Sequence, residues 1–400
     1  MRYAVVNFAY GRGPYLRTVE LALALNAARE GRRQERLGII VPWVYGEDQR
    51  RVMLEEFAQH DIKHPGEILL DATLGAILKR VFYGESDYET ALKSFVTEGA
   101  DASRDAQMYL AGQLAVQNLS GESNAVPGSD IVLQLARSPR VDFGISPRYD
   151  VTFAHISEIL EHVLGESSEM VKVDRNLVRE AIPMLRVLEE KAKFVGLAEP
   201  GTFSYLEGRM RRYRTERAIP PTITPPAPND DPLDVGIFVT VTGIPGLERL
   251  FQEAKALGMH LYTNDPDAVP GGERMLPHVV PNPAILFQFA RAGWGSVWLS
   301  QLSGTPLVVP DFDPADDPEI LYNNRCIEVL GLGIVWRGES LQELISDSDA
   351  LRPGIRARNE ELRRRFGMLD GNRYAAAIIA NSAGHASVGM IPVEKRRGGS

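Results

Sequence analysis

Residues 281–333 read PNPAILFQFARAGWGSVWLSQLSGTPLVVPDFDPADDPEILYNNRCIEVLGLG. This pattern predicts a helix that ends near Arg291, a tight loop over 292–295, a second helix from Ser296 and a strand over 306–309. Gly293 and Gly295 let the backbone approach a ligand closely, and the unpaired N–H groups at the start of the second helix favour an anion. Because Arg291 adds a cation beside them, the stretch predicts a diphosphate site.

The chain on either side of this stretch alternates between strand and helix patterns. After residue 232, a strand over 234–241 meets Thr242 and Gly243, a helix runs to about residue 256, and a strand follows over 260–263. The first part of the chain predicts strands over 2–8, 37–43, 67–70 and 131–136, and helices over 15–30, 151–164 and 174–195. Such alternation is typical of α/β proteins with parallel sheets.

The sharpest change in composition lies at residues 218–232, which read AIPPTITPPAPNDDP. Prolines remove backbone donors and stiffen the chain into an extended connector. A chain of 400 residues is also longer than one core usually grows. We therefore expect two Rossmann-like doubly wound domains that face a cleft, over residues 1–217 and 233–385, joined by the linker 218–232 and followed by a disordered tail over 386–400.

The overall composition excludes several classes of protein. Hydrophobic residues make up 44% and charged residues 24%, as in globular proteins, and the formal net charge of -9 argues against wrapping a nucleic-acid backbone. A single cysteine, Cys326, allows neither an internal disulfide nor a multi-thiolate metal site. The sequence begins without a secretory signal pattern and carries no apolar run long enough to span a bilayer, so we expect a cytoplasmic protein with at most peripheral membrane contact.

The segment AGWGSVWLSQLSGTPLVVP at 292–310 resembles the nucleotide-sugar signature of the GT-B glycosyltransferases, and NNRCIEVLGLG at 323–333 resembles the helix that follows it. The resemblance covers residues 234–336. It implies that the second domain holds a nucleotide-sugar, UDP-sugar being favoured, and that the first domain binds a small-molecule or lipid acceptor. The residues implied to bind substrate in the second domain are Thr242, Gly243, Arg291, Gly293, Trp294, Gly295, Ser296, Asp313, Asp316, Asp317, Glu319, Asn323 and Asn324.

Three positions depart from the UDP-glucuronosyl type of this family. Arg291 stands where that type has His, Leu299 where it has a Glu for the ribose, and Val279 where a base-stacking Trp is expected. The resemblance therefore implies a distant member of the fold.

The first glycine loop, Gly11-Arg12-Gly13, is half of a dinucleotide fingerprint, but Leu16 replaces the third glycine, so an NAD site is disfavoured. In the resembled family this loop faces the cleft, which implies contact with donor or acceptor. Inverting members usually place a His or carboxylate base there, and this loop has neither. Asp150 and His155 are then the candidate catalytic bases, or the reaction retains configuration and the leaving phosphate takes the proton.

Several motifs have a structural explanation beside the functional one. Trp294 and Trp298 lie four residues apart, which suits packing against each other as well as stacking on a ligand. The string from Asp311 to Asp313 resembles a metal-binding Asp-x-Asp, but a solvated loop is the favoured explanation, and we expect neither a metal nor a cofactor. The basic run 209–217 reads as a solvated helix face or, alternatively, a surface for an anionic membrane or acceptor.

These observations predict a metal-independent hexosyltransferase that moves a sugar from a nucleotide-sugar to an acceptor. Two alternatives stay open on the same fold. A UDP-sugar 2-epimerase would act on the donor alone, and a non-catalytic protein would bind the nucleotide-sugar without turning it over.

Overall fold

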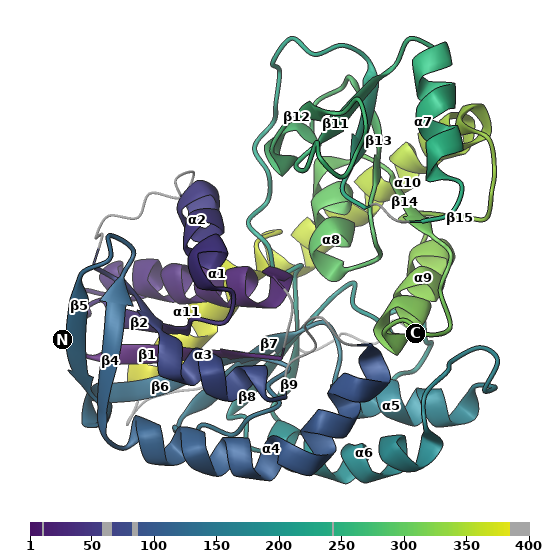
Figure 1. The fold of residues 1–400 in the computed structure, drawn as a ribbon. Coiled ribbons are helices and arrows are strands. Elements are labelled where there is room, and N and C mark those ends of the chain that lie inside the picture. The colour runs from purple at the N-terminus through teal and green to yellow at the C-terminus, as the bar shows by residue number, and fades with distance from the viewer. Residues whose placement is uncertain (10–11, 58–65, 82–86, 242–243, 385–400) are drawn as a thin grey trace, which may run out of the picture.

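The computed structural model describes residues 1–9, 12–57, 66–81, 87–241 and 244–384. The chain forms two α/β units, one carrying the early strands and one the late strands (Figure 1). Their sheets contain different parts of the sequence, because every strand up to residue 219 belongs to the first and every strand from residue 236 belongs to the second. Residues 220–232 of the predicted linker lie between these two sets of strands, whereas its first two residues, Ala218 and Ile219, belong to the last strand of the first sheet.

The first sheet has the order β5-β4-β3-β2-β1-β6-β7-β8-β9. Its strands are β1 (Tyr3–Phe8), β2 (Gly38–Pro42), β3 (Ile68–Asp71), β4 (Gln113–Asn118), β5 (Ser123–Pro127), β6 (Ile131–Arg137), β7 (Arg148–Thr152), β8 (Phe194–Ala198) and β9 (Glu216–Ile219). Its helices are α1 (Arg12–Glu30), α2 (Gly46–Phe57), α3 (Ala72–Lys79), α4 (Tyr88–Leu110), α5 (Ile156–Gly165) and α6 (Arg175–Glu190), with a short 3-10 turn at Gly128–Asp130. All pairings are parallel except those of β4, which pairs antiparallel with β3 and β5.

The second sheet has the order β12-β11-β10-β13-β14-β15 and is parallel throughout. Its strands are β10 (Gly236–Val239), β11 (His260–Thr263), β12 (Glu273–Arg274), β13 (Ile285–Phe289), β14 (Leu307–Pro310) and β15 (Gly333–Trp336). Helices α7 (Leu247–Ala256), α8 (Trp294–Ser303), α9 (Pro318–Leu330), α10 (Leu341–Phe366) and α11 (Gly371–Gly384) alternate with or follow the strands, and a 3-10 turn covers Pro277–Val279. The prediction of a second parallel α/β unit is confirmed.

Two predicted helices are wrong in part. The segment before Arg291 is the strand β13, because its apolar residues fill a sheet that is covered on both faces, and such strands lack the alternation that distinguishes a strand. Helix α8 then begins at Trp294, two residues earlier than predicted. The predicted helix over 151–164 starts late for the same reason: all residues of β7 are buried, and α5 begins only at Ile156.

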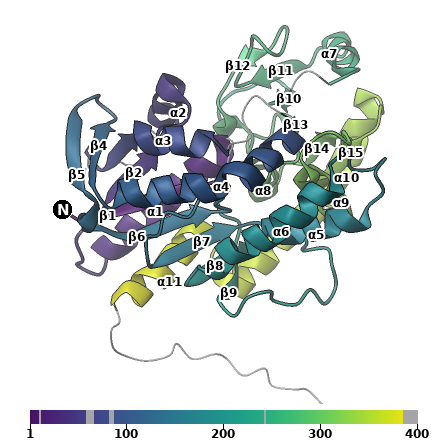
Figure 2. The same ribbon diagram turned by 60° about the horizontal axis from the view of Figure 1, so that its bottom comes forward.

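Helix α11 belongs to the first core although it follows the second sheet in the sequence. Its residues Ala375, Ala376, Ile379 and Ala380 are buried in the cluster that contains β1 and β2. Figures 1 and 2 both show α11 beside the first sheet, and it packs mainly on α1. The predicted second domain, residues 233–385, includes this helix, whereas the helix packs against the first unit.

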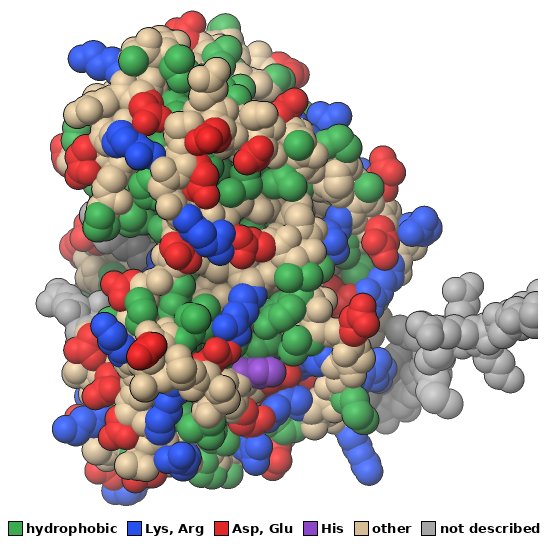
Figure 3. Space-filling model, turned by 90° about the vertical axis from the view of Figure 1, so that its right-hand side faces the viewer, with side chains coloured by type: hydrophobic (Ala, Val, Ile, Leu, Met, Phe, Trp, Pro, Cys, Tyr) green, Lys and Arg blue, Asp and Glu red, His purple; other side chains and the backbone are tan. Residues whose placement is uncertain are grey.

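Neither the face drawn in Figure 3 nor the basic run presents a concentrated positive charge. On the face drawn in Figure 3, acidic and basic side chains are mixed and do not gather by sign. Residues 209–217 form a loop and the start of β9 in place of the predicted helix, and Arg209 and Arg212 are held in ion pairs with Glu158 and Glu161. Within the described ranges, no helix is long and apolar enough to cross a bilayer.

Candidate functional site

The start of α8 has backbone donors that no side chain caps. Gly293 is its N-cap and supplies no side-chain hydrogen bond, so the N–H groups of Trp294 and Gly295 have no partner inside the helix. Among the described residues, no atom would lie within 4 Å of a Cβ atom built on Gly293. A Cβ atom built on Gly295 would have only the Arg17 Nε atom at this distance, 4.0 Å away. The position of the helix end and the space beside it fit an anion.

Arg291 lies between β13 and α8, next to this helix end. Its guanidinium forms an ion pair with Asp316 in the loop before α9, and 43% of its side chain is exposed. The ion pair joins the turn over 292–295 to the acidic loop, by which we mean residues 311–317. Arg291 therefore lies close in sequence to the start of α8, and Asp316 neutralises part of its charge.

The aspartate side chains of the acidic loop accept hydrogen bonds from nearby backbone N–H groups. Asp313 accepts the Ala315 N–H at 2.9 Å, and Asp311 accepts the Phe312 N–H at 2.9 Å. Asp317 caps α9 by accepting the Glu319 N–H at 2.9 Å. These bonds are those of turns and helix caps, and the described residues contain no group of three or more potential metal ligands here or elsewhere.

Glu319 is a carboxyl group with a strongly raised pKa. It lies in the first turn of α9, is partly buried and accepts a hydrogen bond from the Asn323 amide at 3.0 Å. Burial and the nearby Asp317 carboxylate raise its pKa to about 8, although Asn323 and Arg291 oppose the shift. Glu319 can therefore hold or release a proton near neutral pH.

Trp294 and Asn323 lie inside the molecule and join its two units. Asn323 accepts hydrogen bonds from the Trp294 indole at 2.8 Å and the Thr202 hydroxyl at 2.9 Å, and donates to the Ala292 carbonyl at 2.7 Å. Thr202 belongs to the loop after β8, so the network connects α8 and α9 to the first unit. Trp294 and Asn323 therefore hold α8 and α9 against the first unit, in place of the predicted direct contact with substrate.

Asn324 and Trp298 are likewise committed to internal contacts. The Asn324 amide donates to the Pro310 carbonyl at 3.0 Å, which ties α9 to the end of β14. Trp298 is fully buried, donates to the Pro200 carbonyl at 2.8 Å and packs on Trp294 with ring centroids 5.4 Å apart. The packing explanation for the two tryptophans is confirmed.

The first unit places two arginines opposite the second unit. Arg17 lies on α1 and forms an ion pair with Glu20, and Arg137 ends β6, where it is 3% exposed and donates to the Thr222 hydroxyl at 2.9 Å. Sequence reasoning missed both. The signal available for Arg137 was a charged residue at the carboxyl end of an apolar strand, the edge where ligands bind to parallel sheets.

The two predicted catalytic bases, Asp150 and His155, lie within the first unit. Asp150 pairs with Arg148 at 2.8 Å in the middle of the sheet, and burial raises its pKa. His155 is 3% exposed, and its Nε2 atom lies 3.0 Å from a Glu216 carboxylate oxygen. Among the described residues, both side chains form their hydrogen bonds and ion pairs with residues of the first unit, so neither is brought to the start of α8.

Part of the predicted site cannot be placed. Gly11, Thr242 and Gly243 lie outside the described residues, as does the side chain of Arg12. Gly13 lies in the first turn of α1, with nothing within 4 Å of a Cβ built on it, and Ser296 is the third residue of α8.

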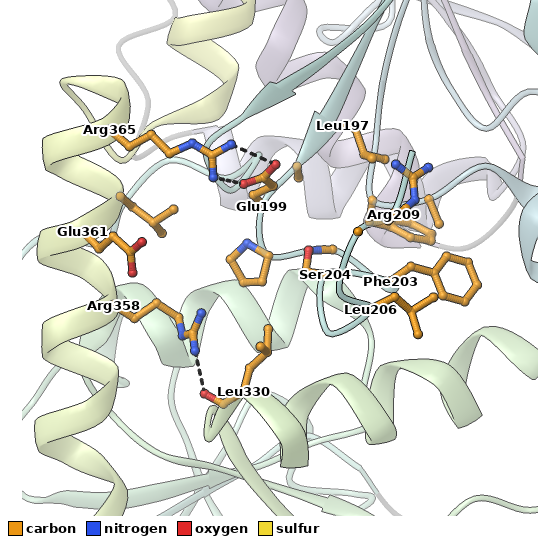
Figure 4. Close-up of a pocket in the computed structure, with 17 residues that line it drawn as sticks. Leu197, Glu199, Phe203, Ser204, Leu206, Arg209, Leu330, Arg358, Glu361 and Arg365 are labelled. Atoms are coloured by element: carbon orange, nitrogen blue, oxygen red, sulfur yellow. Dashed lines mark hydrogen bonds and ion pairs between the residues drawn. The ribbon is translucent and has the colours of Figure 1, made fainter. Parts of the chain in front are cut away.

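A separate cavity of about 390 Å³ lies at the junction of the two units (Figure 4). The loop after β8 lines it from one side, and α10 lines it from the other. An ion pair between Glu199 and Arg365 spans this junction, and Arg358 donates to the Leu330 carbonyl at 3.0 Å. None of the described residues predicted for the site lines this cavity, so it is distinct from the start of α8.

No protein-family model matches the chain, and no curated protein matches it. Solved structures do match in fold. A UDP-glucosyltransferase from Polygonum tinctorium has a TM-score of 0.58 at 13% identity, covering 95% of this chain and 98% of that chain. The glycosyltransferase SnogD from Streptomyces nogalater has a TM-score of 0.54 at 14% identity, covering 96% and 100%.

A third structure, UGT2 from Phytolacca americana complexed with UDP-2fluoro-glucose and pterostilbene, has a TM-score of 0.56 at 11% identity and covers 96% of this chain and 99% of that chain. In all three cases the match spans both α/β units. At these identities the likeness is one of fold, and it agrees with the two parallel sheets described above. The chain therefore has the GT-B fold of the glycosyltransferases.

Proposed function

We propose that this protein transfers a hexosyl group from a nucleoside-diphosphate sugar, with a UDP-sugar favoured, to an acceptor bound by the first unit. The observation that carries the proposal is the start of α8, where no side chain caps the helix and the described residues leave room for a Cβ atom at both Gly293 and Gly295. A diphosphate suits this position because the N–H groups and the helix dipole both favour negative charge. The matched structure in complex with a UDP-sugar analogue supports the choice of donor.

Negative charge grows on the diphosphate as the bond to the anomeric carbon breaks. Helix α8 and Arg291 would stabilise that charge, and fixed donors of this kind need little reorganisation during the reaction. Arg291 would exchange its partner Asp316 for the diphosphate, which leaves the Asp316 carboxylate free for a sugar hydroxyl. No metal is required in this scheme, so we expect activity to persist in EDTA.

Glu319 replaces Asp150 and His155 as the group proposed to exchange a proton. It lies in the first turn of α9, beside Arg291, whereas the other two contact only the first unit. Its raised pKa places its titration near neutral pH, where an acid–base group is most effective. Its proposed partner is a hydroxyl group of the sugar or of the acceptor.

A thermal-shift screen of nucleotide-sugars tests the proposal, because a ligand that binds only the native state raises the melting temperature. We expect at least one UDP-sugar to raise it and to release UDP when an acceptor is added. The proposal fails if no nucleoside-diphosphate sugar shifts the melting temperature. Formation of an epimer without acceptor would point to the 2-epimerase, and binding without hydrolysis or transfer would point to a non-catalytic protein.

A further inference from the structure

The first unit carries two arginines, Arg17 and Arg137, whose guanidinium groups each bond to one neighbour through a terminal nitrogen and leave the Nε donor unused. The Nε atoms of Arg17 and Arg137 are both buried, and neither has a hydrogen-bond partner among the described residues. Arg137 is 3% exposed, so water cannot fully replace the missing bond. Burying an unsatisfied donor of a charged group costs free energy, which proteins accept mainly at functional sites.

The two arginines come from neighbouring elements of the first unit: Arg137 pairs in register with Phe8 at the end of β1, and the helix that follows β1, α1, carries Arg17. Burial, and next the Arg17 charge, lower the pKa of Arg137 to about 9, while Glu20 and Glu319 oppose this shift. Arg17 also lies beside Gly295 of α8, 4.0 Å from a Cβ built there. The pair therefore lies between the two units, on the first unit's side of the proposed donor site.

The local carboxylates do not neutralise the pair fully. Glu20 is engaged by Arg17 and also accepts the Asn372 amide at 3.2 Å. Glu319 comes from the second unit, and burial there favours its neutral form. An arginine pair with free N–H groups matches the paired oxygens of a carboxylate or phosphate, which guanidinium groups bind through two parallel hydrogen bonds.

We propose that Arg17 and Arg137 form an anion subsite of the first unit, at the carboxyl ends of β1 and β6, and that the acceptor carries a carboxylate or phosphate group that occupies it. This inference rests on the proposed function, because it assigns the donor diphosphate to α8 and a second anion to the arginine pair. The same arginines could instead reach the donor diphosphate, and the experiment separates these two sources.

The test is calorimetric titration with inorganic phosphate, first on the protein alone and then on the protein saturated with UDP. We expect phosphate to bind in the presence of UDP, and Arg17→Gln to weaken this binding at least tenfold while UDP affinity stays within about threefold. Arg17→Lys should recover part of it, since it keeps the charge and loses the planar fork. Arg51→Gln, at an exposed arginine of α2, is the matched control and should bind phosphate as the wild type does.

Three results would overturn the inference. Competition between phosphate and UDP would assign the arginines to the donor diphosphate. Unchanged phosphate binding in a folded Arg17→Gln variant would show that Arg17 is not part of the subsite. Absence of phosphate binding to the UDP complex would show that the subsite does not exist. Failure of UDP to bind the wild type is a different result, because it contradicts the proposed function.

Discussion

At the scale of single residues, Arg291 is the side chain whose role is most open to measurement. It flanks the start of α8 and is paired with Asp316. If it neutralises the leaving diphosphate, its charge matters more in the transition state than in the ground state. We expect Arg291→Ala to lower kcat by about two to three orders of magnitude, with a smaller change in donor KM, and Arg291→Lys to recover part of the loss.

The matched control is Arg337→Ala, which also removes a half-exposed arginine from an ion pair, here with Glu328. We expect it to leave kcat unchanged. Normal turnover in Arg291→Ala would show that the backbone of α8 holds the diphosphate without help from this side chain.

The raised pKa of Glu319 predicts how the stability of the protein changes with pH. Its pKa is raised from an ordinary 4.5 to about 8 in the native state, so the native state binds this proton more tightly than the unfolded state. The stabilising contribution is complete below about pH 4.5 and is lost as the pH rises towards 8. Glu319→Gln removes this titration. The melting temperature of the variant minus that of the wild type should therefore increase by about 2 to 4 °C as the pH is raised from about 5 to about 8.5.

Differential scanning calorimetry across this pH range checks the prediction. Glu328→Gln, on the same helix and 40% exposed, provides the comparison and should follow the wild type. Parallel curves for wild type and Glu319→Gln would mean that the Glu319 carboxyl titrates in the ordinary range.

At the scale of elements, the contact of α8 and α9 with the loop after β8 depends on Asn323. Its amide bonds to Thr202, Trp294 and Ala292, all inside the protein. Asn323→Ala would leave several buried polar groups without partners, so we expect a loss of about 2 to 4 kcal/mol in the free energy of unfolding. Urea denaturation measures it, with the exposed Asn124→Ala expected to change stability by less than about 0.5 kcal/mol. A comparably small loss in Asn323→Ala would show that this network contributes little.

The elements also show what the sequence could reveal. Strands β1, β2, β3 and β6 of the first sheet and β10, β11 and β14 of the second follow from apolar runs separated by glycine and proline. Strand β13 was mistaken for a helix because a strand buried on both faces has no alternation. The antiparallel pair β4 and β5 was missed, since more than half of its residues are exposed.

The site was predictable only where backbone and motif define it. The glycine turn at Gly293 and Gly295 was found because close approach of a ligand requires glycine there. Arg17 and Arg137 were missed because their significance depends on contacts between segments more than a hundred residues apart, which no local pattern records. Asp150 and His155 were chosen by chemical type alone, and the structure gives both of them partners within the first unit.

At the scale of the whole molecule, two parallel sheets with different sequences meet at a network of side chains from both. The first unit supplies Arg17, Arg137 and the loop after β8, and the second supplies the start of α8 and the first turn of α9. Helix α11 returns to pack on α1, so the second unit is tied to the first at both of its ends. This arrangement places a proposed donor site and a proposed acceptor site on facing surfaces.

The central claim is that a nucleoside diphosphate binds at the start of α8, and isothermal titration with UDP tests it most directly. We expect the wild type to bind UDP and Gly295→Val to weaken that binding at least tenfold, because a side chain there blocks approach to the free N–H groups. Gly354→Val, at a helical glycine of α10 with nothing within 4 Å of a built Cβ, should bind UDP as the wild type does. Equal UDP affinity in wild type and a folded Gly295→Val variant would contradict the account.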